Sequence, residues 1–218
     1  MFGDRENDYT DVNYWDKRFE DEAEYEWIAN FDQCSRLIVP HLKPDHRILH
    51  LGCGNSKLSY QLSQAGFPNV TNVDYSSCLI GKLSKENSVH FANMDWVCDD
   101  IRTLEKLEDS TFDMVIEKAV IESLLANEKS VWTLSDSAKA DLRSTLVAVH
   151  RVLKPGGLFI SISFTPPYFR VPHLVEPNFW DCEVEEFGDG GFHFYCYRMR
   201  KGQKPDVEHL EKYLRVTR

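Results

Sequence analysis

A short apolar run that ends in two glycines is the feature of this sequence that most constrains its fold. The run at 47–51 has the composition of a buried strand, and Gly52 and Gly54 follow it closely. Beyond Ser56, the spacing of the apolar residues predicts a helix over 57–65. Glycine adopts backbone angles that strain other residues, and it lets a ligand approach the main chain closely. The stretch therefore predicts a strand, a tight turn and a helix built around a ligand.

An acidic residue ends the next apolar run. The run at 70–74 is typical of a buried strand, and its last residue is Asp74. In α/β folds, a glycine turn after one strand and an acid at the tip of the next hold a ribose-bearing cofactor. Asp74 could instead cap the helix that begins near Ser76, and the sequence leaves both roles open.

Strand and helix signals alternate along most of the chain. Helices are predicted over 31–42, from Ser76 to about Glu86, and over 141–153, and three further strands are predicted at 89–92, 112–118 and 158–164. Parallel strands joined by crossover helices form a doubly wound α/β sheet. Ligands bind at the carboxyl ends of the strands in such a sheet, which is where Asp74 lies.

The pattern changes after residue 167. Two strand-like runs, 184–187 and 192–197, flank the glycine-rich segment 188–191, which is the signature of a hairpin. We therefore predict a mostly parallel, seven-stranded sheet whose edge is an antiparallel C-terminal hairpin. A single domain is expected over 14–201, between a mobile N-terminal arm at 1–13 and a polar tail at 202–218 that carries a short helix after Pro205.

Composition and charge exclude several classes of protein. No apolar run is long enough for a membrane helix, and the N-terminus has no secretory signal, so we expect a cytoplasmic protein without a membrane partner. None of the six cysteines forms a CxxC pair or a zinc-like set, so no metal site is expected. The net charge of −10 argues against nucleic acid as a partner. It fits a basic protein substrate, and it fits simple solubility equally well.

The glycine turn also excludes two common nucleotide sites. A dinucleotide fold requires Gly-x-Gly-x-x-Gly, but Lys57 stands where the third glycine would be. A triphosphate site requires a loop that ends in Gly-Lys-Ser/Thr, which is absent as well. The turn therefore favours a cofactor that has no pyrophosphate.

Four motifs together resemble those of class I S-adenosylmethionine-dependent methyltransferases. They are Leu-His-Leu-Gly-Cys-Gly-Asn-Ser at 49–56, Asn-Val-Asp-Tyr-Ser at 72–76, Phe-Asp-Met-Val-Ile-Glu-Lys at 112–118 and Arg-Val-Leu-Lys-Pro-Gly-Gly at 151–157. The resemblance covers about residues 12–200 and implies a Rossmann-like fold and S-adenosylmethionine as cofactor. With Tyr-Trp-Asp-x-Arg-Phe at 14–19, the chain is similar to the methyltransferase-like group that methylates lysines of translation elongation factor 1-alpha.

The resemblance implies a role for individual residues around the cofactor. Gly52 approaches the methionine part, Asp74 accepts from both ribose hydroxyls, and Tyr75 stacks near the adenine. Asp100, with Ile101, meets the adenine edge, although Asp99 is an alternative for that position. The lid over the cofactor and one wall of the cleft complete the implied site, and they consist of Trp15, Phe19, Trp27 and Lys118.

The substrate side is less constrained. Lysine must lose a proton before it attacks a methyl group, and an aromatic slot favours that loss by desolvation. Glu117 and Lys118 are the candidate catalytic residues, with Glu117 or Glu122 holding the incoming cation, although Glu117 and Lys118 could also be an ordinary solvated pair. The candidate wall residues are Phe164, Tyr168, Phe169 and Phe192.

One loop departs from the family pattern. Relatives follow the Glu/Asp-Lys pair with Gly-Thr-Leu-Asp, whereas this chain has Ala-Val-Ile-Glu at 119–122. Loss of the glycine stiffens the loop and puts the identity of the substrate in doubt. The sequence therefore leaves open a monomeric protein-lysine methyltransferase, a methyltransferase of a small molecule or another protein nucleophile, and a non-catalytic cofactor-binding module.

Overall fold

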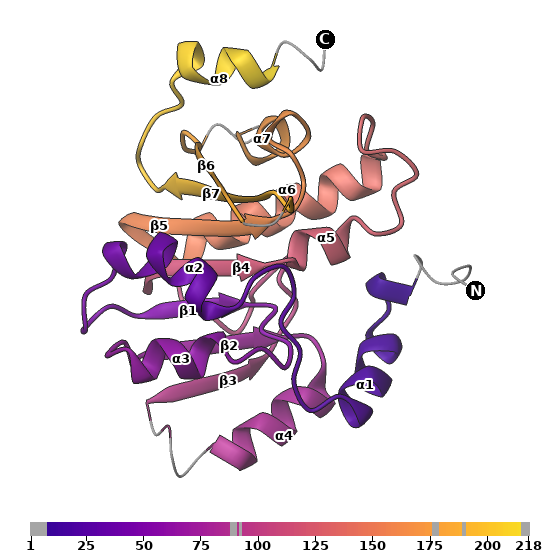
Figure 1. Cartoon of the computed structure of the whole chain (residues 1–218), viewed down its shortest axis with the longest axis vertical. Helices are drawn as coiled ribbons and strands as arrows, with labels where there is room; N and C mark the ends of the chain where they lie inside the picture. Colours follow the sequence, from indigo (N-terminus) through magenta and orange to yellow (C-terminus); the bar gives the residue numbers. More distant parts are fainter. Residues whose placement is uncertain (1–7, 88–90, 92, 176–178, 189–190, 215–218) are drawn as a thin grey trace.

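A seven-stranded sheet forms the centre of the molecule (Figure 1). The computed structural model describes residues 8–87, 91, 93–175, 179–188 and 191–214. The strands are β1 (Ile48–Leu51), β2 (Val70–Asp74), β3 (Met94–Cys98), β4 (Phe112–Lys118), β5 (Leu153–Ser163), β6 (Glu183–Phe187) and β7 (Phe194–Arg200). Their spatial order is β3-β2-β1-β4-β5-β7-β6.

The strands β3, β2, β1, β4 and β5 each pair in parallel with the next in that order. Strand β7 is antiparallel to both of its neighbours, β5 and β6. The predicted doubly wound, mostly parallel sheet with a C-terminal antiparallel hairpin is therefore confirmed. The strand order reverses at β1, which lies between β2 and β4. Such a switch point leaves a crevice at the carboxyl ends of the strands.

Helices lie on both faces of the sheet (Figure 1). In chain order they are the 3₁₀ helix η1 (Asp8–Thr10), α1 (Val12–Asp21), α2 (Phe31–Ile38), the 3₁₀ helix η2 (Val39–His41), α3 (Leu58–Gln64), α4 (Ser77–Asn87), α5 (Val120–Leu124), α6 (Asp136–Val152), α7 (Pro167–Val175) and α8 (Val207–Leu214). Within the described parts of the chain, no helix is both long enough and apolar enough to cross a membrane.

The alternation of side chains along the central strands builds two separate cores. On β1, Ile48 packs with residues of α2 and α3, whereas the next residue, Leu49, packs with residues of α6 and α7. On β4, Ile116 belongs to the core with α2 and α3, and Val115 belongs to the core with α6 and α7. Successive residues of a strand point to opposite faces, so an unbroken apolar strand requires a layer of helices on each side.

The third predicted strand and the start of one predicted helix differ from the observed elements. The third strand is Met94–Cys98; of the predicted range 89–92 the structure describes only Phe91, which lies outside any strand. An exposed acid, Asp95, interrupts the apolar run of this edge strand and hides its signal. Helix α6 begins at Asp136 rather than 141, because Ser135 caps it by accepting from the Ala138 amide.

Two short helices, α5 and α7, were not predicted. Helix α7 begins at Pro167, where the sequence had indicated a break in structure. Proline is accepted at the first helical position because the amide hydrogen that it lacks has no partner in the helix there.

Both ends of the chain contain more structure than a mobile arm and a polar tail would. Residues 1–7 of the predicted arm lie outside the described residues, but Asp8–Thr10 form η1 and the side chain of Asp11 caps α1. The predicted helix after Pro205 is confirmed as α8, and its Leu210 is buried in the core beside α7. The boundaries of the domain remain a prediction.

The residue that follows β4 has a strained backbone conformation. Ala119 has φ +67° and ψ +10°, which is the left-handed conformation. A side chain in this conformation costs about 1–2 kcal/mol relative to glycine. The alanine therefore occupies a position whose backbone suits the glycine that the family pattern has there.

We predict that Ala119→Gly changes the free energy of unfolding by between about 0 and +1 kcal/mol. Relief of the left-handed strain offsets the lost methyl burial and the gain in unfolded-chain entropy. The matched control is Ala140→Gly, an exposed position inside α6, where the same change destabilises by about 1 kcal/mol. Urea unfolding measures both variants, and an equal loss at the two positions would contradict the prediction.

Candidate functional site

A cavity of about 380 Å³ lies at the carboxyl ends of β1, β2 and β4. Figure 1 shows η1 and α1 on the same side of the sheet as these strand ends. The structure brings together at this cavity the residues predicted to bind a cofactor: Trp15, Phe19, Trp27, Gly52, Asp74, Tyr75, Asp100, Ile101 and Lys118. Their common location supports the predicted site, although their individual roles remain a prediction.

The glycine turn forms the floor of the cavity. Gly52 and Gly54 have φ of +59° and +50°. A Cβ atom on Gly52 would lie 2.5 Å from Cγ2 of Val120 and 2.8 Å from its Cγ1, so the first residue of α5 occupies the space of a side chain there. At Gly54 the nearest atom to such a Cβ is Cζ of Phe19, at an ordinary 3.8 Å. Gly52 is therefore required by both its backbone angle and its neighbour.

Asp74 connects the glycine turn to α4. Its Oδ2 accepts from the Gly54 amide and its Oδ1 from the Ser76 amide, each at 3.0 Å. The carboxylate thus orders the start of α4, as the capping role predicts, and it also lines the cavity, where the ribose-binding role stays a prediction. Burial raises the pKa of Asp74, and the amide hydrogen bonds act against that increase. Each oxygen retains a further acceptor position for a hydroxyl group.

The structure distinguishes Asp100 from Asp99. Asp100 lines the cavity, whereas Asp99 is absent from the lining and accepts from the amides of Asp100 and Lys106 at 2.8 Å. The guanidinium of Arg102 binds the Asp100 carboxylate at 2.6 Å, and these hydrogen bonds lower the pKa of Asp100. Asp100 is thus an ionised acceptor at the rim beside Ile101 and Tyr75.

His50 also lines the cavity, and the sequence analysis did not select it. Its Nδ1 lies 2.8 Å from Oγ of Ser59, whose hydroxyl donates to Oδ1 of Asn72 at 2.5 Å. A hydroxyl has one hydrogen, so in this network Nδ1 of His50 donates and Nε2 is left as an acceptor. Burial lowers the pKa of His50 to about 3, which keeps the ring neutral. The only sequence signal was a polar residue inside an apolar strand.

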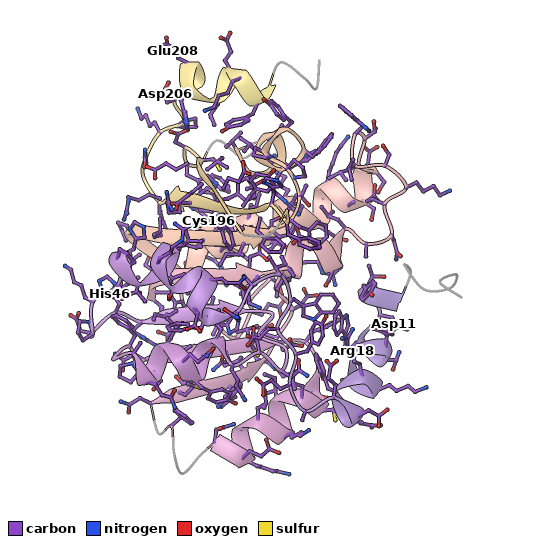
Figure 2. All side chains as sticks on the ribbon, viewed as in Figure 1. Asp11, Arg18, His46, Cys196, Asp206 and Glu208 are labelled. Atoms are coloured by element: carbon purple, nitrogen blue, oxygen red, sulfur yellow. The ribbon has the colours of Figure 1, made fainter. Side chains whose placement is uncertain are left out.

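Residues 8–29 form a segment that we call the lid, and its aromatic side chains cover one side of the cavity. The rings of Trp15 and Phe19 stack at 5.6 Å, and Nε1 of Trp15 donates to the carbonyl of Tyr9 at 2.9 Å. Arg18 lies among these rings (Figure 2), with its guanidinium carbon 4.9 Å from the centre of the Trp27 ring. The predicted aromatic lid is therefore present, and it includes Tyr9 from the predicted arm.

Lys118 reaches the lid. Its Nζ donates to the carbonyl oxygen of Trp27 at 2.7 Å and to Oε2 of Glu26 at 2.8 Å. The side chain is 3% exposed. The pair formed by Glu117 and Lys118 is therefore not a solvated surface pair.

The proposed catalytic role of Glu117 is not supported by its position. Glu117 is fully buried outside the cavity lining, where it accepts from the Ser161 hydroxyl and, at 2.9 Å, from the Val120 amide. Burial, together with the nearby charge of Glu122, raises the pKa of Glu117 to about 7. Glu122 in turn binds Arg170 and the Ser163 hydroxyl. Neither carboxylate lines the cavity, so neither is placed there to hold an incoming cation.

The predicted aromatic wall is not found at this cavity. Phe164, Tyr168 and Phe192 are exposed, and Phe169 packs edge-on against Trp132 with ring centres 4.6 Å apart. None of the four predicted wall residues lines the cavity. The aromatic surface of the cavity comes mainly from the lid instead, together with Tyr75.

Comparison with known proteins identifies methyltransferases as relatives of this chain. A family model described as a methyltransferase domain matches residues 49–161. The Mus musculus protein named EEF1A lysine methyltransferase 4 is 38% identical over 206 residues, which are 93% of this chain and 80% of that protein.

Two solved structures share the fold. A SAM-dependent methyltransferase from Methanosarcina mazei aligns with a TM-score of 0.57 at 18% identity, over 77% of this chain and 98% of that one. The N-methyltransferase NodS from Bradyrhizobium japonicum WM9, in complex with S-adenosyl-L-homocysteine, aligns with a TM-score of 0.52 at 16% identity, over 72% and 79%. These similarities bear on the fold alone.

Gly52→Ala should destabilise the protein by about 2–4 kcal/mol, because the new methyl group overlaps Val120 and the backbone is left-handed. Gly54→Ala carries the backbone cost without the overlap and should lose only about 1 kcal/mol. Urea unfolding of Gly52→Ala, Val120→Ala and the double variant measures the steric part. The double variant should be at least about 1 kcal/mol more stable than the sum of the single changes predicts. Simple additivity would rule out the contact as the cause.

The buried carboxyl of Glu117 should make stability depend on pH. Its folded pKa of about 7 lies above the ordinary value of 4.5, so the folded state holds a proton that the unfolded state has released. Stability should therefore fall as pH rises from 4.5 to 7, by up to about 3 kcal/mol from this group. Glu117→Gln, which resembles the protonated form, should remove that part of the slope in urea unfolding at pH 5 and pH 7. The exposed Glu105→Gln is the control, and equal slopes in both variants would refute the assignment.

Proposed function

This chain belongs to the methyltransferase family, and on that premise we propose that it transfers a methyl group from S-adenosylmethionine to a lysine of translation elongation factor 1-alpha. The observation that carries the proposal is the 38% identity to EEF1A lysine methyltransferase 4, which extends over 93% of this chain. The match leaves only about 7% of the 218 residues of this chain unaligned, which is fewer than the residues of the lid, so it includes at least part of the lid as well as the sheet.

The residues of the cavity fit S-adenosylmethionine. Its volume of about 380 Å³ lies within the usual range of small-molecule sites, about 300–1,000 Å³. Gly52 carries no side chain over the floor, and the buried Asp74 carboxylate retains acceptor positions for the ribose hydroxyls. Asp100 and Tyr75 line the cavity and would hold the adenine, and Trp15 and Trp27 line it from the lid.

Methyl transfer to an amine requires mainly that the reactants are held in position and that water is excluded from the site. When bound, S-adenosylmethionine supplies a methyl group on a positively charged sulfur, which an amine lone pair can attack in line. A lysine ammonium has no lone pair, so the substrate must first release a proton. The aromatic side chains of the lid remove water from the cavity, and desolvation favours the neutral amine. Positioning of the reactants accounts for the remaining rate enhancement.

The departure at 119–122 does not alter the backbone that a glycine would give. Ala119 adopts the left-handed angle, and Val120 then places its side chain against Gly52. Ala119 and Val120 therefore line the same cavity as Gly52, and the loop keeps its contact with the glycine turn despite its difference from the family pattern. We also propose a cytoplasmic monomer; the six unpaired cysteines are consistent with a reducing compartment.

Incubation with tritium-labelled S-adenosylmethionine tests the proposal. We expect the label in purified elongation factor 1-alpha, at a lysine found by peptide mapping. Asp74→Asn should lower cofactor affinity about 10- to 100-fold, because charge-assisted hydrogen bonds to the ribose are lost. Label only in small molecules would contradict a protein substrate, and cofactor binding without any transfer of label would contradict catalysis. The melting temperature of Asp74→Asn controls for loss of the fold.

A further inference from the structure

The carboxylate of Glu26, which no sequence motif singled out, accepts hydrogen bonds from two separate parts of the chain. Its carboxylate accepts from the Ser56 hydroxyl at 2.9 Å and the Lys57 amide at 2.7 Å, both in the loop that follows the glycine turn. It also accepts from Nζ of Lys118 at 2.8 Å, at the end of β4. One lid side chain thus joins two walls of the cavity that are far apart in the sequence.

The same contact fixes the lid residue that follows. Nζ of Lys118 also donates to the carbonyl oxygen of Trp27, whose side chain lines the cavity. The next residue, Ile28, has φ +66°. This left-handed angle is strained for a β-branched side chain and persists only where surrounding contacts hold it. The contacts of Glu26 and Lys118 restrain the two residues that precede Ile28.

Burial separates this ion pair from the neighbouring one that links the lid to the loop after the glycine turn. The side chains of Lys118 and Glu26 are 3% and 21% exposed, whereas those of Lys57 in that loop and Glu24 in the lid are 54% and 41% exposed. Exposed ion pairs are screened by water and contribute little. Removing one partner of a shielded pair leaves the other charge without compensation, which makes the shielded pair the stronger restraint.

We propose that Glu26 is a positioning residue that holds the lid closed over the cofactor, and that rupture of its contact with Lys118 sets the rate at which cofactor and its product exchange. The proposal rests on the proposed function insofar as it assigns the cavity to S-adenosylmethionine. Glu26 acts through Lys118 and the backbone of Trp27, and no contact of Glu26 with the cofactor is required. Lys118 thereby has a role in lid closure that differs from the catalytic one predicted from the sequence.

The test compares Glu26→Gln with Glu24→Gln, which makes the same change of charge two residues away in an exposed pair. In stopped-flow displacement, Glu26→Gln should release S-adenosylhomocysteine about 10- to 100-fold faster than the unmodified protein. Glu24→Gln should change the rate less than twofold. The KM for S-adenosylmethionine should rise with Glu26→Gln while kcat is maintained or increases. Equal release rates in the two variants would overturn the proposal.

Lys118→Met supplies the second arm. It removes the ammonium group, so it should speed release as Glu26→Gln does, and the double variant should be no faster than the faster single variant. Additive effects would show that the two residues act independently and would refute the contact as the restraint. Ser56→Ala, which removes one donor to the same carboxylate, should give a smaller increase and serves if either larger change prevents folding.

Hydrogen exchange of the protein without cofactor separates this proposal from the proposed function. Glu26→Gln should increase exchange in the lid, residues 8–29, while the amides of β1 and β4 keep their protection. This measurement does not depend on which cofactor the cavity binds. Unchanged exchange in the lid would overturn the inference even if the protein proved to be an active methyltransferase, and increased exchange would support it even if the labelling experiment failed.

Discussion

The parallel pairing of β1 with β2 on one side and β4 on the other is the constraint on which the site depends. Leu51 lies opposite Val73 in one neighbour and Glu117 in the other, so the three strands end almost level. The turns after them consequently meet at one edge of the sheet. Gly52 after β1, Asp74 at the end of β2 and Lys118 at the end of β4 come within one cavity because of this register, and no local sequence signal would bring them together.

Two carboxylates at this edge of the sheet, Asp74 and Glu117, differ in their surroundings although they are chemically similar. Asp74 and Glu117 each end or nearly end a strand and each accept from backbone amides at the start of the following helix. Asp74 faces the cavity, whereas Glu117 faces the opposite core, where a second carboxylate and Arg170 share its surroundings. A carboxylate in the first environment can serve a ligand, and one in the second serves the ordering of α5.

The lid links the N-terminal segment to the centre of the fold through polar contacts as well as aromatic packing. Asn55 donates to the carbonyl of Glu22 at 3.1 Å, and the hydroxyl of Ser76 binds Asp16. With Lys118, these contacts place at least one hydrogen bond between the lid and the chain at or just beyond the end of each of the three central strands. The aromatic rings alone would leave the orientation of the lid undetermined, because apolar packing is not directional.

The sequence by itself determined the strand–turn–helix at Gly52, the acid at Asp74 and the alternation of strands with helices, because each depends on neighbouring residues or on simple periodicity. It could not determine which of Glu117 and Lys118 faces the cavity, since adjacent strand residues point to opposite faces and only the pairing fixes which face is which. The roles of His50 and Glu26 depend likewise on partners distant in the chain, Asn72 and Lys118. Tertiary structure decided these, because a polar side chain acquires its function from the groups that fold around it.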